Sequence, residues 1–553
     1  MGTSLSVPVL VLGGGTGGVA AALALARHGI RCIVSEPTAW IGGQLTSQGV
    51  PPDENRWVEG LDGITSVTAS YQQFRQAVRH WYRNNRKLSP NARNNPTLNP
   101  GGGWVSRLCF EPRIGHAVLM QMLAEHIAAG RVTLLLHHEP VSADVVGDRV
   151  THVTLRDTTT GLEHIIEPKL ILEATETGEL YPLAGIEHHI GAEHRDTYQE
   201  LHGRPDHADP KDQQAITWCF AMEHRPDEDH RIDKPDGYDT WRSYIPRLSG
   251  GWPGPLFSWD IAGRDQPSRT LPLVPWPDTP TPGQLELWRY RRIVNGGIYQ
   301  HDPGSPNDTP PDVSLFNCVQ MDYFQKPILG VSAEEKQEAL KQARQQSLCF
   351  FYWMQTEAPS HNNPDKLGYP GLRLRGEELG TDDGLAMAPY IREPRRLAAM
   401  TVVTEAHVGQ QQRIEAGHKP MRHPTRVAGE PFKDSVGIGH YHIDLHPSCA
   451  MRGEVFVPAC PFRIPLGALL PTRVRNVIAS GKAIGVTHVA NGCYRLHPVE
   501  WNIGEAAGTL AAYCLTDNLE PAQVHQDRAR LYHLQNRLVA TGVPLTWPWE
   551  DGL

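Results

Sequence analysis

The sequence predicts an α/β protein in which helices cover a mainly parallel sheet, and three observations near its beginning carry this prediction. Residues 7–12 form an uninterrupted apolar run, which is typical of a strand buried on both faces. A glycine-rich turn at 13–18 is followed by an Ala- and Leu-rich helical segment at 19–28. A second apolar run at 31–35 ends at Glu36. Together these segments predict one β-α-β unit.

Size and composition indicate a large globular protein with more than one structural unit. The chain has 553 residues, of which 40% are hydrophobic and 20% are charged. The formal net charge is −9 and is spread along the sequence, which disfavours nucleic acid as a partner because phosphate binding needs clustered Lys and Arg. The nine cysteines form no Cys-x-x-Cys pair, which favours a reducing compartment. Because no basic leader and no membrane-length apolar run is visible, we expect a cytoplasmic protein without membrane contact.

Further elements follow along the chain. Residues 83–103 are rich in Asn, Pro and Gly and predict a mobile loop. Residues 186–330 are irregular and dense in Pro, Trp, His and Asp, so we expect them in a cap or substrate unit. Helices are expected at 61–82, 112–129, 333–356 and 500–515. Strands are expected at 132–137, 149–155, 170–174, 436–445 and 474–479.

The glycine-rich turn contains a dinucleotide-binding motif, Gly13-x-Gly15-x-x-Gly18. Gly13 permits the tight turn, Gly15 lets the backbone approach a pyrophosphate, and Gly18 lets helix and strand pack closely. Thr16 lies inside the motif, at the helix N-terminus that favours phosphate. Glu36 stands where a carboxylate accepts hydrogen bonds from a ribose hydroxyl, which favours FAD or NAD over NADP. The alternative is a glycine-rich turn without a ligand, and strand, helix and terminal acid together disfavour it.

Four segments give the chain a family resemblance. They are the N-terminal unit with Ile41-Gly42-Gly43-Gln44-Leu45-Thr46, the stretch Leu172-Glu173-Ala174-Thr175-Glu176-Thr177-Gly178-Glu179-Leu180, the stretch Tyr390-Ile391-Arg392-Glu393-Pro394-Arg395-Arg396, and residues 476–508. With these motifs the sequence resembles the FAD-dependent oxidoreductase family with the glutathione-reductase-type flavin fold, in particular a subgroup distantly akin to the fumarate reductase flavoproteins. The resemblance spans most of the chain and leaves residues 186–330 unmatched.

The resemblance implies a Rossmann-type FAD-binding domain that is discontinuous in sequence, with an inserted α+β substrate or cap domain. We expect the FAD-binding domain at 1–60, 104–185 and 436–520, and a helix with the mobile loop at 61–103. The cap domain is expected at 186–435, and a C-terminal extension at 521–553.

Several residues are implied as FAD contacts by their match to the family motifs. They are Gly42, Gly43, Gln44, Thr46, Val141, Ala174, Thr175, Gly481, Gly504 and Ala507. A helix through Gly504 and Ala507 that points at the flavin would stabilise negative charge on the reduced ring, and the alternative is an Ala/Gly helix packed on the sheet. Glu176 stands where the family usually has glycine. Some relatives attach FAD through a His just after the glycine doublet, and residues 44–49 contain no His, so we expect non-covalent FAD.

A histidine-rich segment is the first candidate for the chemistry. His440, His442, Asp444 and His446 alternate along the expected strand 436–445 and would share one face. This pattern predicts a strand that lines the substrate pocket, with His442 or His446 as acid or base. A metal site and a half-exposed strand with its polar residues in solvent are the alternatives, and we expect no metal.

Two further groups are candidates. Tyr494 or His497, just before the last helix, could take a proton as hydride leaves, and the alternative is cofactor support or the start of the helix. Arg392, with Arg395 and Arg396, could bind a carboxylate through two parallel hydrogen bonds, and ion pairs with nearby acids are the alternative.

The sequence therefore predicts an FAD-dependent oxidase or dehydrogenase that transfers a hydride between flavin and a small organic molecule. A carboxylate on this substrate and a homo-oligomeric state stay open. The alternatives are an FAD-dependent monooxygenase and a protein that uses FAD structurally. The stretch 481–485 reads Gly-Lys-Ala-Ile-Gly where related aromatic hydroxylases have a Gly-Asp-Ala-Ala-His-like segment, which disfavours the monooxygenase. No second glycine motif is visible for NAD(P)H.

Overall fold

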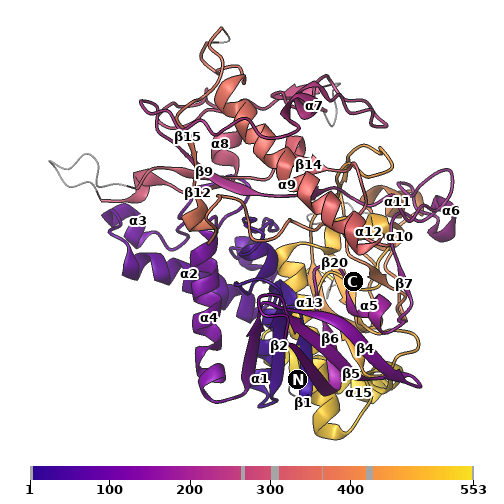
Figure 1. Ribbon diagram of the computed structural model, residues 1–553. Helices are drawn as coiled ribbons and strands as arrows, with labels where there is room; N and C mark the ends of the chain where they lie inside the picture. Colours follow the sequence, from indigo (N-terminus) through magenta and orange to yellow (C-terminus); the bar gives the residue numbers. More distant parts are fainter. Residues whose placement is uncertain (1–3, 263–267, 301–309, 364, 419–426, 551–553) are drawn as a thin grey trace.

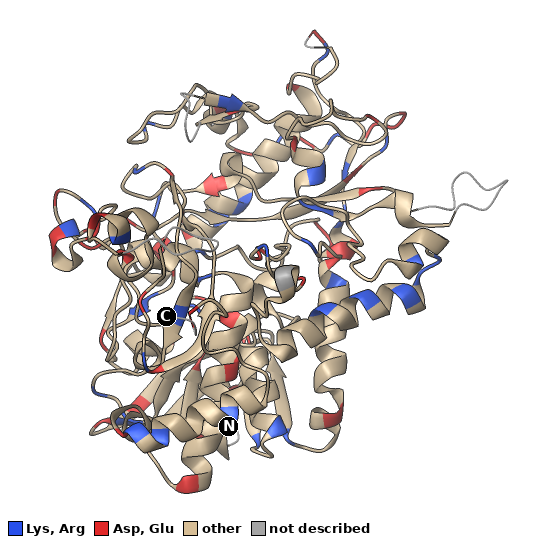
Figure 2. Cartoon of the chain, turned by 180° about the vertical axis from the view of Figure 1, so that it is seen from behind, with Lys and Arg blue, Asp and Glu red and all other residues tan. Residues whose placement is uncertain are grey.

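The computed structural model describes residues 4–262, 268–300, 310–363, 365–418 and 427–550 (Figure 1). In the view of Figure 1 a large sheet with its helices forms the lower part, and a smaller sheet beneath helix α9 (Ala333–Thr356) forms the upper part. Lys and Arg are interspersed with Asp and Glu over the described chain (Figure 2). Among the described residues, no helix combines the length and the apolarity that crossing a membrane requires.

The large sheet confirms the predicted α/β class. Its strand order is β3-β2-β1-β6-β5-β4, and β21 pairs with the end of β6. The strands β3, β2, β1, β6 and β21 run parallel, whereas β5 pairs antiparallel with the first half of β6 and β4 pairs antiparallel with β5. Their bounds are β1 Ser4–Leu12, β2 Cys32–Glu36, β3 Val132–Leu136, β4 His138–Val146, β5 Arg149–Asp157, β6 Glu163–Glu173 and β21 Val477–Ala479.

The register brings the carboxyl ends of four strands to one edge. Leu12 pairs with both Ser35 and Glu173, and Glu173 also pairs with Ala479. The loops after β1, β2, β6 and β21 therefore start side by side, which is where open α/β sheets bind their ligands.

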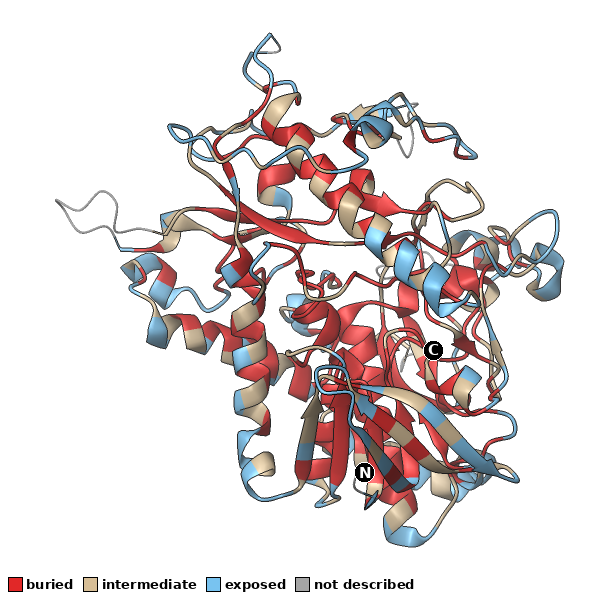
Figure 3. Cartoon of the chain, viewed as in Figure 1, coloured by how far each residue is buried: buried red, intermediate tan, exposed pale blue. Residues whose placement is uncertain are grey.

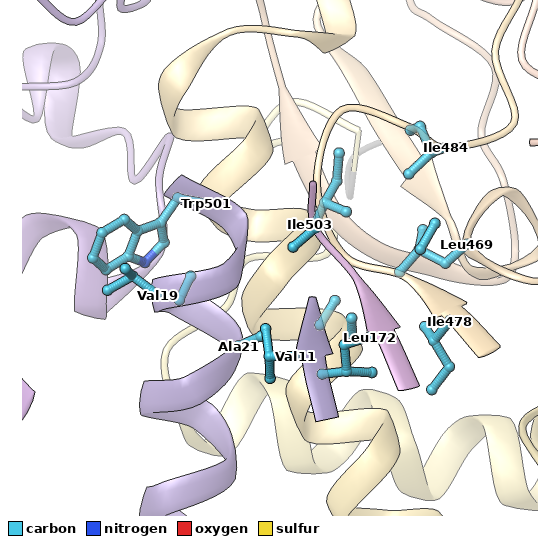
Figure 4. Packing of buried hydrophobic residues seen from close by; sticks show 14 of the residues in the cluster. Val11, Val19, Ala21, Leu172, Leu469, Ile478, Ile484, Trp501 and Ile503 are labelled. Atoms are coloured by element: carbon cyan, nitrogen blue, oxygen red, sulfur yellow. The ribbon is translucent and has the colours of Figure 1, made fainter. Parts of the chain in front are cut away.

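Two helices cross at very short range over this sheet. A Cβ added to Gly504 of α13 (His497–Asp517) would lie 2.0 Å from the carbonyl oxygen of Gly17 in α1 (Thr16–Arg27). Figure 4 shows Ala21 of α1 and Ile503 of α13 beside Val11 and Leu172 of the strands. The Ala and Gly residues of both helices are therefore explained by helix packing. The helices α2 (Ala69–Asn85), α4 (Pro112–Ala128), α14 (Pro521–Gln526) and α15 (Arg528–Ala540) complete the lower part.

The upper part has its own antiparallel sheet and aromatic core. Its strand order is β12-β13-β9-β15, with bounds β9 Phe220–His224, β12 Arg292–Val294, β13 Val313–Phe316 and β15 Leu372–Leu374. Helix α9 has the predicted bounds and begins with a capping box of Ser332 and Glu335. Phe220, Phe257 and Trp259 are buried in one hydrophobic cluster with residues of this helix, so these aromatic side chains form the core of the upper part.

The structure corrects two local expectations. The expected strand 436–445 is broken into β17 (Ser435–Gly439) and β18 (Ile443–Leu445), which pair with the different strands β20 (Phe462–Pro465) and β19 (Val455–Val457). The expected loop 83–103 contains the end of α2 and the short helix α3 (Pro90–Asn94), which Ser89 caps. Leu98 of the same segment is buried.

The core extends across the predicted domain boundaries. Leu397 and Val403, from the segment expected in the cap, join the same hydrophobic core as β1 and β6. Leu538 of the expected C-terminal extension joins it as well. Figure 3 shows this buried centre and the more exposed tips of β4 and β5. The division into domains stays a prediction.

Candidate active site

The turn after β1 has the geometry that its glycines predict. A Cβ at Gly13, whose φ is 94°, would lie 2.3 Å from the carbonyl oxygen of Ala174. A Cβ at Gly18 would lie 1.9 Å from the carbonyl oxygen of Gly13. Only glycine avoids these backbone contacts, so the tight turn and the close approach of helix to strand depend on both positions.

The acid at the end of β2 is oriented by the same turn. The Gly14 N–H donates to Oε2 of Glu36 at 3.1 Å, and the Thr38 N–H and hydroxyl donate to Oε1 at 2.9 and 2.7 Å. Burial raises the pKa of Glu36 to about 7, although the hydrogen bonds from Thr38 and Gly14 oppose this shift. The carboxylate is thus held at the sheet edge beside the glycine turn, where the sequence places a ribose acceptor.

The glycine doublet lies against the start of α1. The Thr16 hydroxyl donates to the carbonyl oxygen of Gly42 at 2.9 Å, and Gly42 and Gly43 have φ values of 112° and 53°. The Thr46 hydroxyl donates to Ile41 within the same turn at 2.7 Å. A Cβ at Gly43 would lie 2.9 Å from the Cα of Gly15. The two glycine segments therefore form the walls of one narrow cradle, which we call the phosphate cradle.

The structure places the remaining predicted cofactor residues at different distances from the phosphate cradle. Ala174 and Thr175 follow β6 and contact the turn, and a Cβ at Gly481 would lie 3.3 Å from the Cα of Ala174. Val141 is at an irregularity in the pairing of β4 with β5. Gly504 and Ala507 lie inside α13, whose first residue is His497, and Gly504 contacts α1. This contact favours the packing alternative for Gly504, and flavin contact at Gly504 and Ala507 stays a prediction.

A cavity of about 260 Å³ lies between the lower and upper parts. Its polar lining includes Asp53, Arg269, Glu286, Arg291, Asn317, Gln320, Arg392, Asp444, His446, Glu454 and Arg495. Its apolar and aromatic lining includes Ile261, Leu271, Leu285, Leu287, Tyr290, Tyr390, Tyr441 and Phe456. Aromatic rings and convergent polar groups together are features of a site for a small organic molecule.

Two of the predicted catalytic residues, Arg392 and His446, line this cavity and meet at Asp322. Arg392 lies 3.1 Å from Asp322 and also donates to Thr217 at 2.9 Å and Asn317 at 3.2 Å. His446 Nδ1 lies 2.6 Å from Asp322, and Nε2 lies 3.7 Å from Asp444. Burial and Arg392 lower the pKa of His446, but the two carboxylates outweigh them and raise it overall. The ion-pair alternative for Arg392 is therefore realised.

The other histidines of this segment do not share a common face with His446. His442 stacks on Phe456 with ring centroids 4.5 Å apart, and His440 packs edge to face against Trp57 at 5.0 Å. The prediction of one aligned face fails because the chain leaves β17 before His440 and pairs again only at Ile443. Among the described residues, no three His, Cys, Asp or Glu side chains gather as ligands of a metal ion would.

Tyr494 and His497 are both buried outside the cavity lining. The Tyr494 hydroxyl donates to the carbonyl oxygen of Arg463 at 2.6 Å, and its ring stacks on Phe462. His497 Nδ1 accepts a hydrogen bond from the Asp53 N–H at 3.0 Å. Burial holds the pKa of His497 well below its usual range, so this imidazole is neutral and supports the segment that carries Asp53.

Asp53 and Arg291 form a group that the sequence did not reveal. Asp53 lies 3.8 Å from Arg291 and accepts a hydrogen bond from the Tyr441 hydroxyl at 3.4 Å. Burial raises the pKa of Asp53 despite the opposing charge of Arg291. The three residues are far apart in sequence, so no local spacing could have revealed the group.

Tyr390 is a second missed residue and separates the cavity from the phosphate cradle. Arg392, Lys482 and Arg495 lie over its ring at 5.0, 5.9 and 5.9 Å from the centroid. Arg495 also donates to the Tyr390 hydroxyl at 2.7 Å and to the Asp444 carboxylate at 3.2 Å. Tyr390 falls in the stretch 390–396 and Arg495 in the stretch 476–508, which the sequence singles out, but neither was predicted as a site residue.

The strand order, the glycine turn and the acid at the end of β2 define an α/β dinucleotide-binding protein. A family model described as FAD dependent oxidoreductase matches residues 8–538. The chain therefore belongs to the FAD-dependent oxidoreductase family, it is an enzyme of that family, and FAD is its cofactor. The kinship to the fumarate reductase flavoproteins and the non-covalent attachment stay predictions.

Solved structures match this chain only in part. A myxobacterial chondrochloren halogenase, described as a variant of FAD-dependent halogenases, is 16% identical with a TM-score of 0.22, and the match covers 41% of this chain and 45% of that chain. The p-nitrophenol 4-monooxygenase of Pseudomonas putida is 12% identical with a TM-score of 0.24, with 40% and 49% covered. The L-proline dehydrogenase of P. horikoshii is 14% identical with a TM-score of 0.18, with 35% and 26% covered. The chain thus spans less than half of these structures, and a comparison with curated proteins finds no match.

The residues of the phosphate cradle fit FAD with one exception. Gly13 permits the turn, Gly15 and Gly43 place no side chain beside the N-terminus of α1 where a pyrophosphate would bind, and Glu36 offers acceptors for a ribose. The exception is Glu176, whose carboxylate lies between Gly15 and Gly43.

Proposed function

We propose that this enzyme transfers a hydride between FAD and a small organic substrate held in the cavity, as an oxidase or dehydrogenase. The observation that supports this proposal is a direct contact between the cavity lining and the segment predicted to bind FAD. Gln44, directly after the glycine doublet, donates to the carbonyl oxygen of Arg495 at 3.1 Å, and the guanidinium of Arg495 lines the cavity. When bound, FAD supplies the group that accepts or gives the hydride.

We propose a carboxylate-bearing substrate, and Arg291 supports this choice. Nε and Nη1 of Arg291 are buried and have no hydrogen-bond partner within the described ranges, and the nearest acid, Asp53, is 3.8 Å away. Nε of Arg392 also has no partner there, but both terminal nitrogens of Arg392 are held by Asp322, Asn317 and the Thr217 segment, whereas Nη1 of Arg291 is not hydrogen-bonded. A guanidinium with free donors binds a carboxylate in bidentate fashion, so Arg291 replaces Arg392 as the expected anchor.

Asp53 is the proposed proton acceptor when the substrate is oxidised. It faces the cavity beside the proposed anchor, and burial shifts its pKa upward, which is the direction a general base at neutral pH needs. His446 is less suited to this role because Asp322 and Asp444 favour its protonated form. His446 would instead stabilise negative charge on the bound molecule.

The test starts from the purified, FAD-loaded full chain. Benzoate and benzamide are titrated while the flavin absorbance is followed. The two molecules have nearly the same shape, but benzoate carries a carboxylate where benzamide carries a neutral amide. Benzoate should perturb the spectrum, and R291M should weaken its binding by about 10- to 100-fold, the equivalent of a ~1.5–3 kcal/mol hydrogen bond to a charged group. R231M, at an exposed arginine paired with Asp229, is the matched control and should change nothing.

Catalysis is tested with a panel of hydroxy, amino and saturated carboxylic acids under anaerobic conditions. Bleaching of the flavin by one of them supports the proposed reaction, and fast reoxidation in air then identifies an oxidase. A flavin that can be photoreduced but is bleached by none of them, together with benzoate binding that R291M leaves intact, would argue against both the reaction and the substrate class.

A further inference from the structure

One carboxylate lies where the structure otherwise prepares room for phosphate. Oε1 of Glu176 would be 2.7 Å from a Cβ at Gly15 and 2.5 Å from a Cβ at Gly43. The same oxygen is buried and has no hydrogen-bond partner in the part of the chain that the structure describes. A buried carboxylate oxygen without a partner is costly, so its position at the α1 N-terminus needs an explanation.

Lys482 holds the other oxygen of this carboxylate. Its ammonium lies 2.5 Å from Oε2 of Glu176 and donates to the carbonyl oxygen of Ile391 at 2.7 Å. The Lys482 side chain is 1% exposed, whereas that of Glu176 is 23% exposed. The cation is therefore fixed from several sides, and the carboxylate is the partner that has a route to solvent.

The surroundings already carry negative charge. Burial, and the nearby charge of Glu176, raise the pKa of both Glu36 and Glu500. A pyrophosphate that entered beside Glu176 would add further negative charge to the same small volume, and like charges at such distances repel strongly outside bulk water.

We propose that Glu176 occupies the phosphate cradle in the FAD-free chain and is exchanged for the pyrophosphate of FAD, with Lys482 as the cation that serves both. In the free protein one oxygen of the carboxylate lies beside the start of α1 without a hydrogen-bond partner among the described residues, and the other pairs with the ammonium of Lys482. When FAD binds, the carboxylate leaves toward solvent and the ammonium faces the pyrophosphate. Lys482 is thereby a cofactor-binding residue, and Glu176 sets the affinity by competition.

This inference explains why an acid is tolerated at position 176. A cradle that holds several glycines and the end of a helix dipole would leave unsatisfied N–H groups and a buried ammonium when FAD is absent. Glu176 pairs with the ammonium until FAD arrives. The inference concerns cofactor binding alone and does not depend on which substrate the enzyme takes.

FAD is first removed from the full chain at high salt. The affinity for FAD is then measured by the change in flavin fluorescence on binding. FAD is compared with riboflavin, which has no phosphate. E176Q keeps the shape of the side chain and removes its charge, and K482M removes the cation. E179Q is the matched control, because Glu179 lies in the same loop but pairs with Lys336 at 2.8 Å.

E176Q should lower the Kd for FAD by about tenfold or more, equivalent to ~1.4 kcal/mol, and leave the Kd for riboflavin unchanged. K482M should raise the Kd for FAD alone, and E179Q should change neither. An unchanged or higher Kd for FAD in E176Q would overturn the proposal, as would an equal effect on riboflavin. If K482M does not fold, the comparison of E176Q with E179Q remains decisive, because the far-UV circular dichroism of both variants checks their fold.

Discussion

The buried carboxylate of Asp322 holds Arg392 and His446 in the lining of the cavity, and its replacement tests this role. It is 1% exposed and lies within hydrogen-bond distance of three side chains. Thr217 donates to it at 2.6 Å, His446 at 2.6 Å, and Arg392 lies 3.1 Å away. D322N keeps the shape of the side chain, removes its charge and replaces one acceptor oxygen with a donor, so the electrostatic and hydrogen-bond contributions change while no packing volume is lost.

The size of the effect follows from burial. Removal of one partner from a buried ion pair leaves the other charge uncompensated, which typically costs about 3–5 kcal/mol. Arg392 is 1% exposed and has no second carboxylate as close as Asp322, so we expect D322N to lower the free energy of unfolding by an amount in that range.

The pH dependence of the free energy of unfolding has a definite sign for both Asp322 and His446. Burial raises the pKa of Asp322, but Arg392 and His446 outweigh it and hold the pKa below its usual value. The contribution of Asp322 is therefore present above its unfolded-state pKa and lost as pH falls through the lower folded-state value. For His446, whose pKa is raised, the contribution is present below 6.5 and lost as pH rises through the folded-state value. D322N should weaken both dependences.

The assay is urea unfolding at saturating FAD, followed by far-UV circular dichroism at pH 6 and pH 8. D239N is the matched control, because Asp239 forms an ion pair with Lys234 at 2.7 Å on the surface, with 79% of its side chain exposed. The control should unfold like the unmodified protein. A D322N variant as stable as the control, with an unaltered pH dependence, would refute the assignment of Asp322 as the charge that holds the cavity wall.

The remaining predictions concern helix packing and Tyr494. G504A should lower stability by about 1–3 kcal/mol and weaken FAD binding, because the added Cβ displaces α13 from the helix that begins at the phosphate cradle. G254A, where a Cβ meets nothing within 4 Å, should change neither stability nor FAD binding. Thermal unfolding measures the stability of both variants, and titration with FAD measures their binding. Y494F should cost about 1 kcal/mol of stability and leave the rate of flavin reduction unchanged. A large loss of that rate in Y494F would return Tyr494 to the list of catalytic residues.

The sequence predicted those parts of the site that depend on local geometry. The tight turn at Gly13 and the packing at Gly18 follow from a strand that leads directly into a helix, and the contacts around both glycines confirm them. The acid of Glu36 was found because it ends the adjacent parallel strand. In each case a few neighbouring residues determine the backbone geometry, so a short motif carries the information, and the ligand contacts stay predictions.

The cavity could not be predicted in this way because its residues meet only in the folded chain. Arg291 lies at the end of a short helix, α8 (Leu287–Tyr290), in a segment without readable periodicity, and Asp53 follows two prolines in a loop. The alternation argument for His440 to His446 assumed one continuous strand. Gly437 and Gly439 instead lie against Asn502 and Phe462, and the change of pairing partner after them breaks the alternation.

The charges around Tyr390 connect the two proposals. Three cations lie over this ring, and each has a carboxylate partner: Lys482 has Glu176, Arg392 has Asp322, and Arg495 has Asp444. Because every cation is already held in place, an anion that replaces one carboxylate gains its contacts without ordering a flexible side chain. The side chain of Asp322 is inaccessible, that of Asp444 is 14% exposed, and that of Glu176, on the side of the phosphate cradle, is the most exposed at 23%. On the two proposals together, an anion is exchanged on the cofactor side of this ring, and the substrate carboxylate binds at Arg291, whose Nη1 has no hydrogen-bond partner among the described residues.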